Sequence, residues 1–210
     1  ISYRIAPLLN SSGRLSSAEI GVKALLSDRK VNSYAIIKSL IDLNNQRKEI
    51  QKNMLNEADL ALNSSKNSII VFSEKWHKGI VGIIASNLVE KYNKPSIVLT
   101  QEKNNLVGSV RTAKGINVLE ILDKCSVFLT KYGGHKSAAG LSLIRENLNK
   151  FKDLFEQEVG KLSNELTKDK QITIDLVLSI DEINDVLYRT IMRFAPFGLA
   201  NEAPVFCTNE

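Results

Sequence analysis

The stretch YGGHKSAAG at 132–140 places one of the chain's two histidines among small residues. A histidine side chain donates a proton or a hydrogen bond near neutral pH, which few other side chains do. Gly133 and Gly134, directly before His135, permit positive φ and a close approach of the backbone to a ligand. Two interpretations fit: a turn needs the glycines and the histidine is incidental, or the backbone is cleared so that a ligand reaches His135.

A second candidate site is the stretch GSVRT at 108–112, which is expected to be a strand. Alternate residues of a strand share a face, so Ser109 and Arg111 point the same way. A forked guanidinium beside a hydroxyl suits the oxygens of a phosphate, and Gly108 would let a ligand approach the backbone. A chance pairing on an edge strand is the alternative.

Two further stretches contain candidate groups. Arg14 follows Gly13 in LLNSSGRLS and would be an ordinary solvated side chain if considered alone. In EKWHKGIVGIIAS, Trp76 and His77 precede a glycine where a helix begins, and the free N–H groups there could hold an anion. The favoured interpretation is that Trp76 anchors this strand-to-helix turn in the core.

The N-terminal third of the chain is expected to be helical after a loop-like segment at 1–17. A short helix is predicted at 18–27, and a long one from about 32 to 62, where there is no Gly or Pro. Apolar residues recur there at close to 3.5-residue spacing, with Arg47 as an interruption. Such a helix spans roughly 45 Å at about 1.5 Å per residue, which suits a strut between domains or a coiled-coil hairpin.

After residue 66 the pattern changes to short β-branched runs that alternate with amphipathic segments. This alternation predicts an α/β fold with a mainly parallel or mixed sheet and flanking helices, at about 66–196. Strands are expected at 68–73, 95–100, 105–112, 138–144 and 172–178, and helices at 78–92, 116–126, 147–164 and 181–194.

Composition narrows the class of protein. With 43% hydrophobic and 24% charged residues, the chain is of the folded, globular kind rather than disordered. No apolar run reaches the length of a membrane span, and the two distant cysteines indicate neither a disulfide framework nor a zinc ribbon, so a cytoplasmic setting is expected. A net charge of +5 allows a polyanionic partner without requiring one.

The order of these motifs resembles that of the RecJ-like exonucleases, a family of the DHH phosphoesterase superfamily. The resemblance covers nearly the whole chain, from LNSSGR through the long helix, WHKGIVGIIAS, GSVRT and GGHKSAAG to FAPFGLANEAPVF. It implies an interdomain loop and connecting helix at 1–65, a DHH-associated α/β domain at 66–196, and at 197–210 the lead-in to an oligonucleotide-binding barrel. The chain is thus expected to be a segment of a longer protein.

The resemblance also implies roles for individual residues. Arg14, Ser109 and Arg111 would contact phosphates of single-stranded DNA, including its 5′ end. His135, presented by Gly133 and Gly134, would face the scissile phosphate as the catalytic residue.

The implied reaction is 5′-to-3′ hydrolysis of single-stranded DNA with Mn²⁺ or Mg²⁺. These ions would be held by a DHH domain outside this segment, because two distant histidines form no metal cluster here, and the segment alone would be inactive. Further implied partners are a single-strand-binding protein and a recombination helicase, in DNA repair and recombination.

Three departures and two alternatives accompany the resemblance. The loop LNSSGR is more usually LNAAGR in the family, a mild change that leaves Arg14 in place. Asn87 stands where the family usually has an arginine, so no phosphate contact is assigned there, and 200–202 differ from the usual Gly-Asn-Pro. The chain could instead belong to related phosphodiesterases of short oligonucleotides or cyclic dinucleotides, although these lack the long helix and the barrel lead-in. It could also be a non-catalytic nucleic-acid-binding module, as in alanyl-tRNA synthetases.

Overall fold

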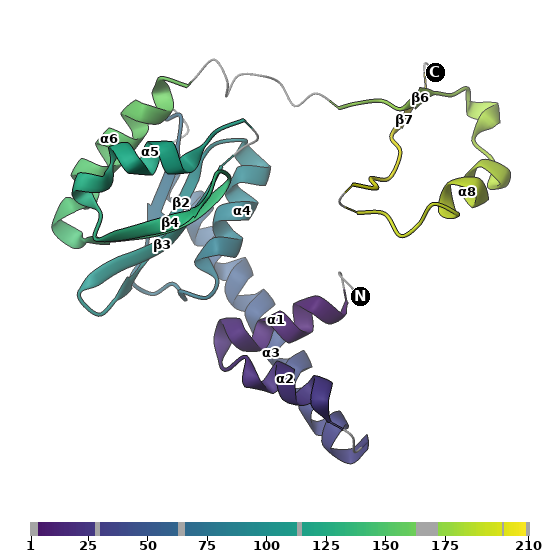
Figure 1. Ribbon diagram of the computed structural model, residues 1–210, viewed down its shortest axis with the longest axis horizontal. Coiled ribbons are helices and arrows are strands. Elements are labelled where there is room, and N and C mark those ends of the chain that lie inside the picture. The colour runs from purple at the N-terminus through teal and green to yellow at the C-terminus, as the bar shows by residue number, and fades with distance from the viewer. Residues whose placement is uncertain are drawn as a thin grey trace. The chain divides into compact units, whose positions relative to one another are not determined.

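The computed structural model describes residues 4–27, 30–62, 66–112, 115–162, 172–198 and 200–208 (Figure 1). The chain divides into two compact units, Ile1–Thr167 and Lys168–Glu210. Each unit is described by itself. All of the residues with an expected role at a phosphate or in catalysis belong to the first unit.

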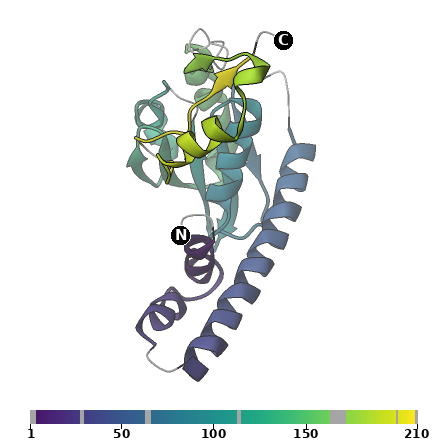
Figure 2. The same cartoon turned by 90° about the vertical axis from the view of Figure 1, so that its right-hand side faces the viewer.

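Three helices begin the first unit: α1 (Ile5–Leu15), α2 (Glu19–Leu26) and α3 (Lys30–Leu60). The long helix α3 confirms the sequence prediction. In Figure 2, the purple α1 and α2 lie beside the blue α3, with which both are in contact.

The helix α1 corrects the prediction of a loop at 1–17. Its proline lies in the first turn, where the missing N–H breaks no helical hydrogen bond. Its serines are packing residues: the side chains of Ser11 and Ser12 are buried and donate to the carbonyls of Leu8 and Leu9, at 2.6 and 2.8 Å. Small side chains that bond their own helix allow neighbouring helices to approach closely.

A five-stranded mixed sheet forms the centre of this unit, in the order β1-β2-β3-β5-β4. Strand β1 is parallel to β2, and the other pairs are antiparallel. This confirms the predicted α/β class with a mixed sheet and flanking helices. The strands are β1 (Ile69–Phe72), β2 (Ser96–Glu102), β3 (Asn105–Arg111), β4 (Lys131–His135) and β5 (Ala138–Ile144).

Helices cover both faces of the sheet and create two cores. On one face, α5 (Val118–Lys124) and α6 (Leu148–Gly160) pack against a cluster that includes Val110, Ala139 and Leu141. On the other, α4 (Val81–Tyr92) and the C-terminal half of α3 pack against a cluster that includes Val98. This second cluster contains no residue of β4 or β5, so no described helix of the first unit packs a hydrophobic core over that end of the second face.

The second unit contains β6 (Leu176–Val177), α8 (Asp185–Met192) and β7 (Phe206–Cys207). The strand expected at 172–178 is thus shorter, and it pairs in parallel with β7 rather than with the five-stranded sheet. This pairing gives the physical reason why the chain divides between Thr167 and Lys168, whereas the sequence places the end of the α/β domain at about 196. Short 3₁₀ turns lie at Ser126–Phe128, Arg145–Asn147 and Ile180–Glu182.

Among the helices that the structure describes, none is both long and apolar enough to cross a membrane.

Candidate nucleic-acid interface

The uncovered end of the sheet brings three of the candidate residues into register. Across β3, β5 and β4, Arg111 lies opposite Ala138, which in turn lies opposite His135. Residues directly opposite one another in antiparallel strands point to the same face. At about 4.8 Å per strand, the Cα atoms of Arg111 and His135 are therefore roughly 10 Å apart.

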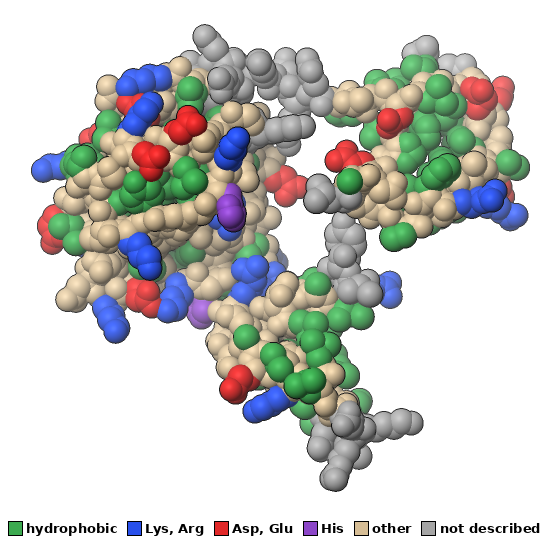
Figure 3. Space-filling model, viewed as in Figure 1, with side chains coloured by type: hydrophobic (Ala, Val, Ile, Leu, Met, Phe, Trp, Pro, Cys, Tyr) green, Lys and Arg blue, Asp and Glu red, His purple; other side chains and the backbone are tan. Residues whose placement is uncertain are grey.

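The next row of the same face consists of Ser109 on β3, Gly140 on β5 and Gly133 on β4. We call the surface formed by Ser109, Arg111, Gly140, Gly133 and His135 the open face. Figure 3 shows both histidines of the chain and several basic side chains on one side of the first unit. The glycines form a bare floor between the Ser109 and Arg111 pair and the exposed His135.

The glycines of this floor are not required by contacts within the protein. Within the described part of the chain, a Cβ at Gly133 would have no atom within 4 Å, and one at Gly140 would meet only the carbonyl oxygen of Gly108, at 3.8 Å. Their small size therefore leaves room for something outside the protein. A shallow pocket over this floor is lined by Val107, Gly108, Lys131, Tyr132, Gly133, Gly140, Leu141 and Ser142.

At position 134, by contrast, the fold itself requires a glycine. Its φ is +156°, and a Cβ there would lie 2.3 Å from the carbonyl oxygen of Ala138. The hairpin between β4 and β5 therefore requires a glycine at this position. The two interpretations of the histidine stretch thus apply to different residues, since Gly134 serves the turn and Gly133 leaves the surface clear.

The side chains of Ser109 and Arg111 rest against the start of helix α4. A Cβ at Gly82 would lie 3.1 Å from Nη2 of Arg111 and 3.2 Å from Oγ of Ser109. The guanidinium also donates from Nη1 to the carbonyl of Val110, at 2.8 Å. The missing side chain of Gly82 therefore leaves room for the guanidinium and the hydroxyl, which lie on the same face of β3 as the strand pattern predicts.

Arg111 is half-buried and has no carboxylate in ion-pair contact among the residues described. Burial lowers the pKa of its guanidinium, and the positive charge of Arg14 lowers that pKa further. The group remains charged at neutral pH. A desolvated cation without a protein counter-ion is a favourable position for an anion.

Arg14 reaches this neighbourhood from the last turn of α1. Its Nη1 donates to the carbonyl of Gly79, at 3.2 Å, and its own carbonyl oxygen would lie 2.1 Å from a Cβ at Gly79. The glycine before α4 therefore lets the end of α1 approach closely. This contact joins segments 65 residues apart and brings Arg14 within electrostatic range of Arg111.

The other residues of the WHKGIVGIIAS stretch have structural contacts. Trp76 is buried, and its Nε1 donates to the Glu57 carboxylate, at 2.7 Å, which agrees with its interpretation as an anchor of the turn. Nδ1 of His77 accepts the N–H of Gly79, at 3.1 Å, and so holds the loop that Arg14 contacts.

Strand packing also requires a glycine at position 108. A Cβ there would lie 2.3 Å from the carbonyl oxygen of Val98 on the neighbouring strand. The glycine thus allows β2 and β3 to pair closely.

The candidate residues do not fit a metal ion. The candidate site provides cations and neutral hydrogen-bond donors, from Arg14, Arg111, Ser109 and His135. A divalent metal ion instead prefers carboxylates grouped with other ligands. Over the described ranges, no group of three or more His, Cys, Asp or Glu side chains could hold a metal.

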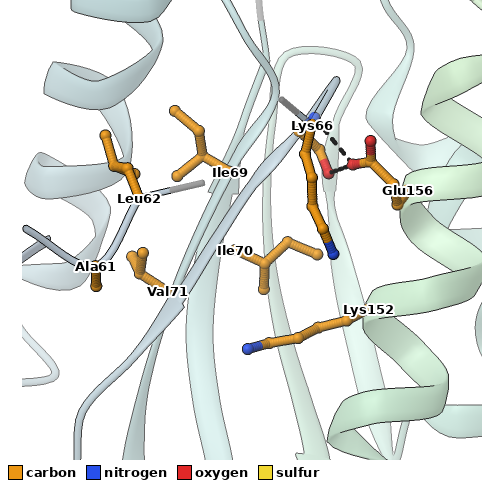
Figure 4. A pocket seen from close by; sticks show the side chains of 9 residues that line it. Ala61, Leu62, Lys66, Ile69, Ile70, Val71, Lys152 and Glu156 are labelled. Carbon is orange, nitrogen blue, oxygen red and sulfur yellow. Dashed lines mark hydrogen bonds between the residues drawn. The ribbon is translucent and has the colours of Figure 1, made fainter. Parts of the chain in front are cut away.

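A separate pocket lies beside strand β1, between the end of α3 and helix α6 (Figure 4). The carboxylate of Glu156 accepts the backbone N–H groups of Asn67 and Ser68, at 2.6 and 3.0 Å, and also the hydroxyl of Ser68. Burial lowers the pKa of the Lys152 ammonium, as does the nearby charge of Lys66. Because Glu156 bonds the segment before β1, the contacts of this pocket are explained by the fold.

Sequence reasoning assigned no role to Gly82, Gly140 or Arg47. Gly82 lies in the expected helix, and its contact with Arg111 and Ser109 depends on tertiary packing. Arg47 is noticeable in the sequence as a charged residue that interrupts the apolar spacing of the long helix.

Two segments of the chain match families of known domains. The DHHA1 domain family matches residues 65–161, and the RecJ OB domain family matches residues 174–210. The single-stranded-DNA-specific exonuclease RecJ of Bacillus subtilis is 31% identical over 212 residues, which are 97% of this chain and 27% of that protein. RecJ of Thermus thermophilus is 27% identical over 206 residues, which are 98% of this chain and 30% of that protein.

A solved structure agrees with these matches. The crystal structure of Thermus thermophilus RecJ in complex with Mn²⁺ superposes with a TM-score of 0.89 at 26% identity, over 99% of this chain and 31% of that one. The chain spans between about a quarter and two fifths of the length of the curated relatives it matches. It carries a DHHA1 domain and a RecJ OB domain and is homologous to the RecJ single-stranded-DNA-specific exonucleases across most of its length.

Proposed function

We propose that this chain is the substrate-binding half of an exonuclease that hydrolyses single-stranded DNA from the 5′ end. The observation that carries the proposal is the pairing of Arg111 and Ser109 over Gly82, beside a floor of glycines that the protein itself does not need. A forked guanidinium and a hydroxyl together offer the donors that the oxygens of one phosphate accept.

Each residue of the site has a distinct task in this proposal. Arg111 and Ser109 together bind one phosphate of the strand, the 5′-terminal phosphate, and Arg14 adds a second positive charge beside it. Gly133, with Gly134 behind it in the hairpin, lets the strand cross the sheet. His135, at the far side of the floor, donates a hydrogen bond or a proton to the scissile phosphate.

The metal ions of the reaction belong to another part of the protein in this proposal. The candidate residues of this chain do not fit Mn²⁺ or Mg²⁺, whereas the Thermus thermophilus structures contain RecJ in complex with each of these ions. Hydrolysis therefore requires a DHH domain in addition to this chain. What this chain does is bind, orient and hold a donor at the phosphate.

The cellular setting is part of the same proposal. We place the enzyme in the cytoplasm, in DNA repair and recombination, with a single-strand-binding protein and a recombination helicase as protein partners. Homology to the RecJ exonucleases is the support for this assignment. Co-purification of these two partners with the tagged full-length protein, dependent on this chain, is the measurement that checks it.

The match of residues 174–210 to the RecJ OB domain, together with α3, favours an exonuclease over a phosphodiesterase of short oligonucleotides or cyclic dinucleotides. The test uses the full-length protein and single strands that carry a label at either end. We expect the 5′ label to be released first from single-stranded DNA, with little release from duplex. Release that begins at the 3′ end, or equal hydrolysis of duplex, would contradict the proposal.

A further inference from the structure

Arg47 is a half-buried arginine in the middle of helix α3 that the proposed site does not use. Its Nη2 donates to Oδ1 of Asn44 at 3.0 Å, and its Nη1 donates to Oε1 of Gln51 at 2.5 Å. Both partners are neutral residues of the same helix. In the part of the chain that the structure describes, no carboxylate forms an ion pair with this guanidinium.

One donor of the guanidinium is left without a partner. Nε of Arg47 is buried from solvent and has no hydrogen-bond acceptor among the residues that the structure describes. A buried polar donor that lacks an acceptor costs folding free energy, and the cost is larger on a charged group. Such groups are rare in folded proteins and call for an explanation, one of which is an absent ligand.

The clamp on Arg47 connects it to the same helix that supports Arg111. Nε2 of Gln51 donates to Oδ1 of Asn87 on α4, at 3.1 Å. Gly82, five residues earlier on α4, is where the Arg111 guanidinium rests. The guanidinium of Arg47 is therefore held on the two-helix framework that also positions the open face.

Arg47 lies within electrostatic range of Arg14, as Arg111 does. Burial lowers the pKa of Arg47, and the positive charge of Arg14 lowers it further. Arg14 has the same effect on Arg111. Arg14 is therefore within electrostatic range of both other arginines. Like charges this near to one another repel, and a bound polyanion relieves that repulsion.

We propose that Arg47 is a third phosphate-binding arginine, which contacts a backbone phosphate of the single strand other than the one bound by Arg111 and Ser109. This inference rests on the proposed function and extends its binding surface from the sheet to helix α3. Asn44 and Gln51 fix the direction of the half-buried guanidinium.

The test measures binding of the full-length protein to a 5′-phosphorylated oligothymidylate, with EDTA present to stop hydrolysis. The variants are Arg47→Gln, which removes the charge, and Arg47→Lys, which keeps it without the fork. Lys48→Gln is the matched control, because Lys48 is the next residue of the same helix and is exposed. Dissociation constants are measured over a series of salt concentrations.

We expect Arg47→Gln to weaken binding at least fivefold at low salt. It should also reduce the slope of log K against log salt concentration by about 0.7, which corresponds to one phosphate of a single strand. Arg47→Lys should keep the wild-type slope and recover only part of the affinity. Lys48→Gln should change neither by more than about twofold in affinity.

A second measurement locates the contact. Single neutral methylphosphonate linkages are placed along the oligonucleotide, one position at a time. In the wild-type protein, a neutral linkage at a contacted phosphate should weaken binding. We expect one such linkage to stop weakening binding in Arg47→Gln, and it should differ from the linkage that stops weakening binding in Arg111→Ala.

Wild-type affinity and slope in Arg47→Gln, or the same linkage lost in both variants, would overturn the inference and leave the proposed function in place. Loss of thermal stability in Arg47→Gln, together with a wild-type salt slope and a wild-type methylphosphonate pattern in that variant, would make Arg47 a structural residue. If the wild-type protein bound no single-stranded DNA, the proposed function itself would fail.

Discussion

Replacement of Arg111 tests the proposed phosphate site at its best-defined residue. Arg111→Ala removes a guanidinium that lies with the Ser109 hydroxyl over Gly82. A charge-assisted hydrogen bond contributes about 1.5–3 kcal/mol, so we expect kcat/KM of the full-length enzyme to fall roughly 10- to 150-fold. Arg111→Lys keeps the charge but loses the fork, and should recover only part of this loss.

The stability of the Arg111 variants separates a binding role from a structural one. The guanidinium is partly desolvated and is repelled by Arg14, so its removal should leave the melting temperature unchanged or slightly higher. A collapsed melting temperature would instead identify a structural arginine.

The assay is nucleotide release from strands with a 5′-phosphate and from strands with a 5′-hydroxyl. If Arg111 holds the terminal phosphate, the defect of the alanine variant should shrink on the hydroxyl strands, because the lost partner is absent there. Wild-type rates in Arg111→Ala on both substrates would refute the assignment.

Three further predictions concern the hairpin and a buried thiol. Gly133→Ala should lower kcat/KM and leave the melting temperature unchanged. Gly134→Ala should instead cost about 1–3 kcal/mol of stability, because Gly134 has a φ of +156° and a Cβ there would clash with Ala138. Thermal melts and rate assays on both variants distinguish the two effects. His135→Gln should lower kcat roughly 10²- to 10⁴-fold with an unchanged melt, since the side chain is exposed; a loss below tenfold would remove it from the catalytic step. Burial raises the pKa of the Cys125 thiol to about 11, so the free energy of unfolding should fall as pH rises from about 9 to 11, and this fall should be smaller in Cys125→Ala in unfolding titrations.

Strand periodicity and residue chemistry were enough to predict much of the candidate site. Ser109 and Arg111 follow from the alternation of a strand, and the contact of both with Gly82 agrees with a shared face. The long helix and the mixed α/β class follow from apolar spacing, because packing of these segments buries the same residues that create the pattern.

Other features depend on contacts that local patterns do not contain. Helix α1 was expected as a loop because serines and glycine have low helix propensity, yet its serines are buried against neighbouring helices. Strand β4 has two glycines and exposed side chains, so it lacks the β-branched signature of a strand and is defined by pairing with β5. The approach of Arg14 to Arg111 arises through Gly79.

The central claim is that the open face binds the 5′ end of a single strand. A structure of the full-length protein with a 5′-phosphorylated oligonucleotide tests it most directly. We expect a phosphate oxygen at roughly 3 Å from the guanidinium of Arg111 and from the hydroxyl of Ser109, with the strand crossing Gly133 towards His135. A strand bound on another surface of the protein, with no phosphate at Arg111, would contradict the account.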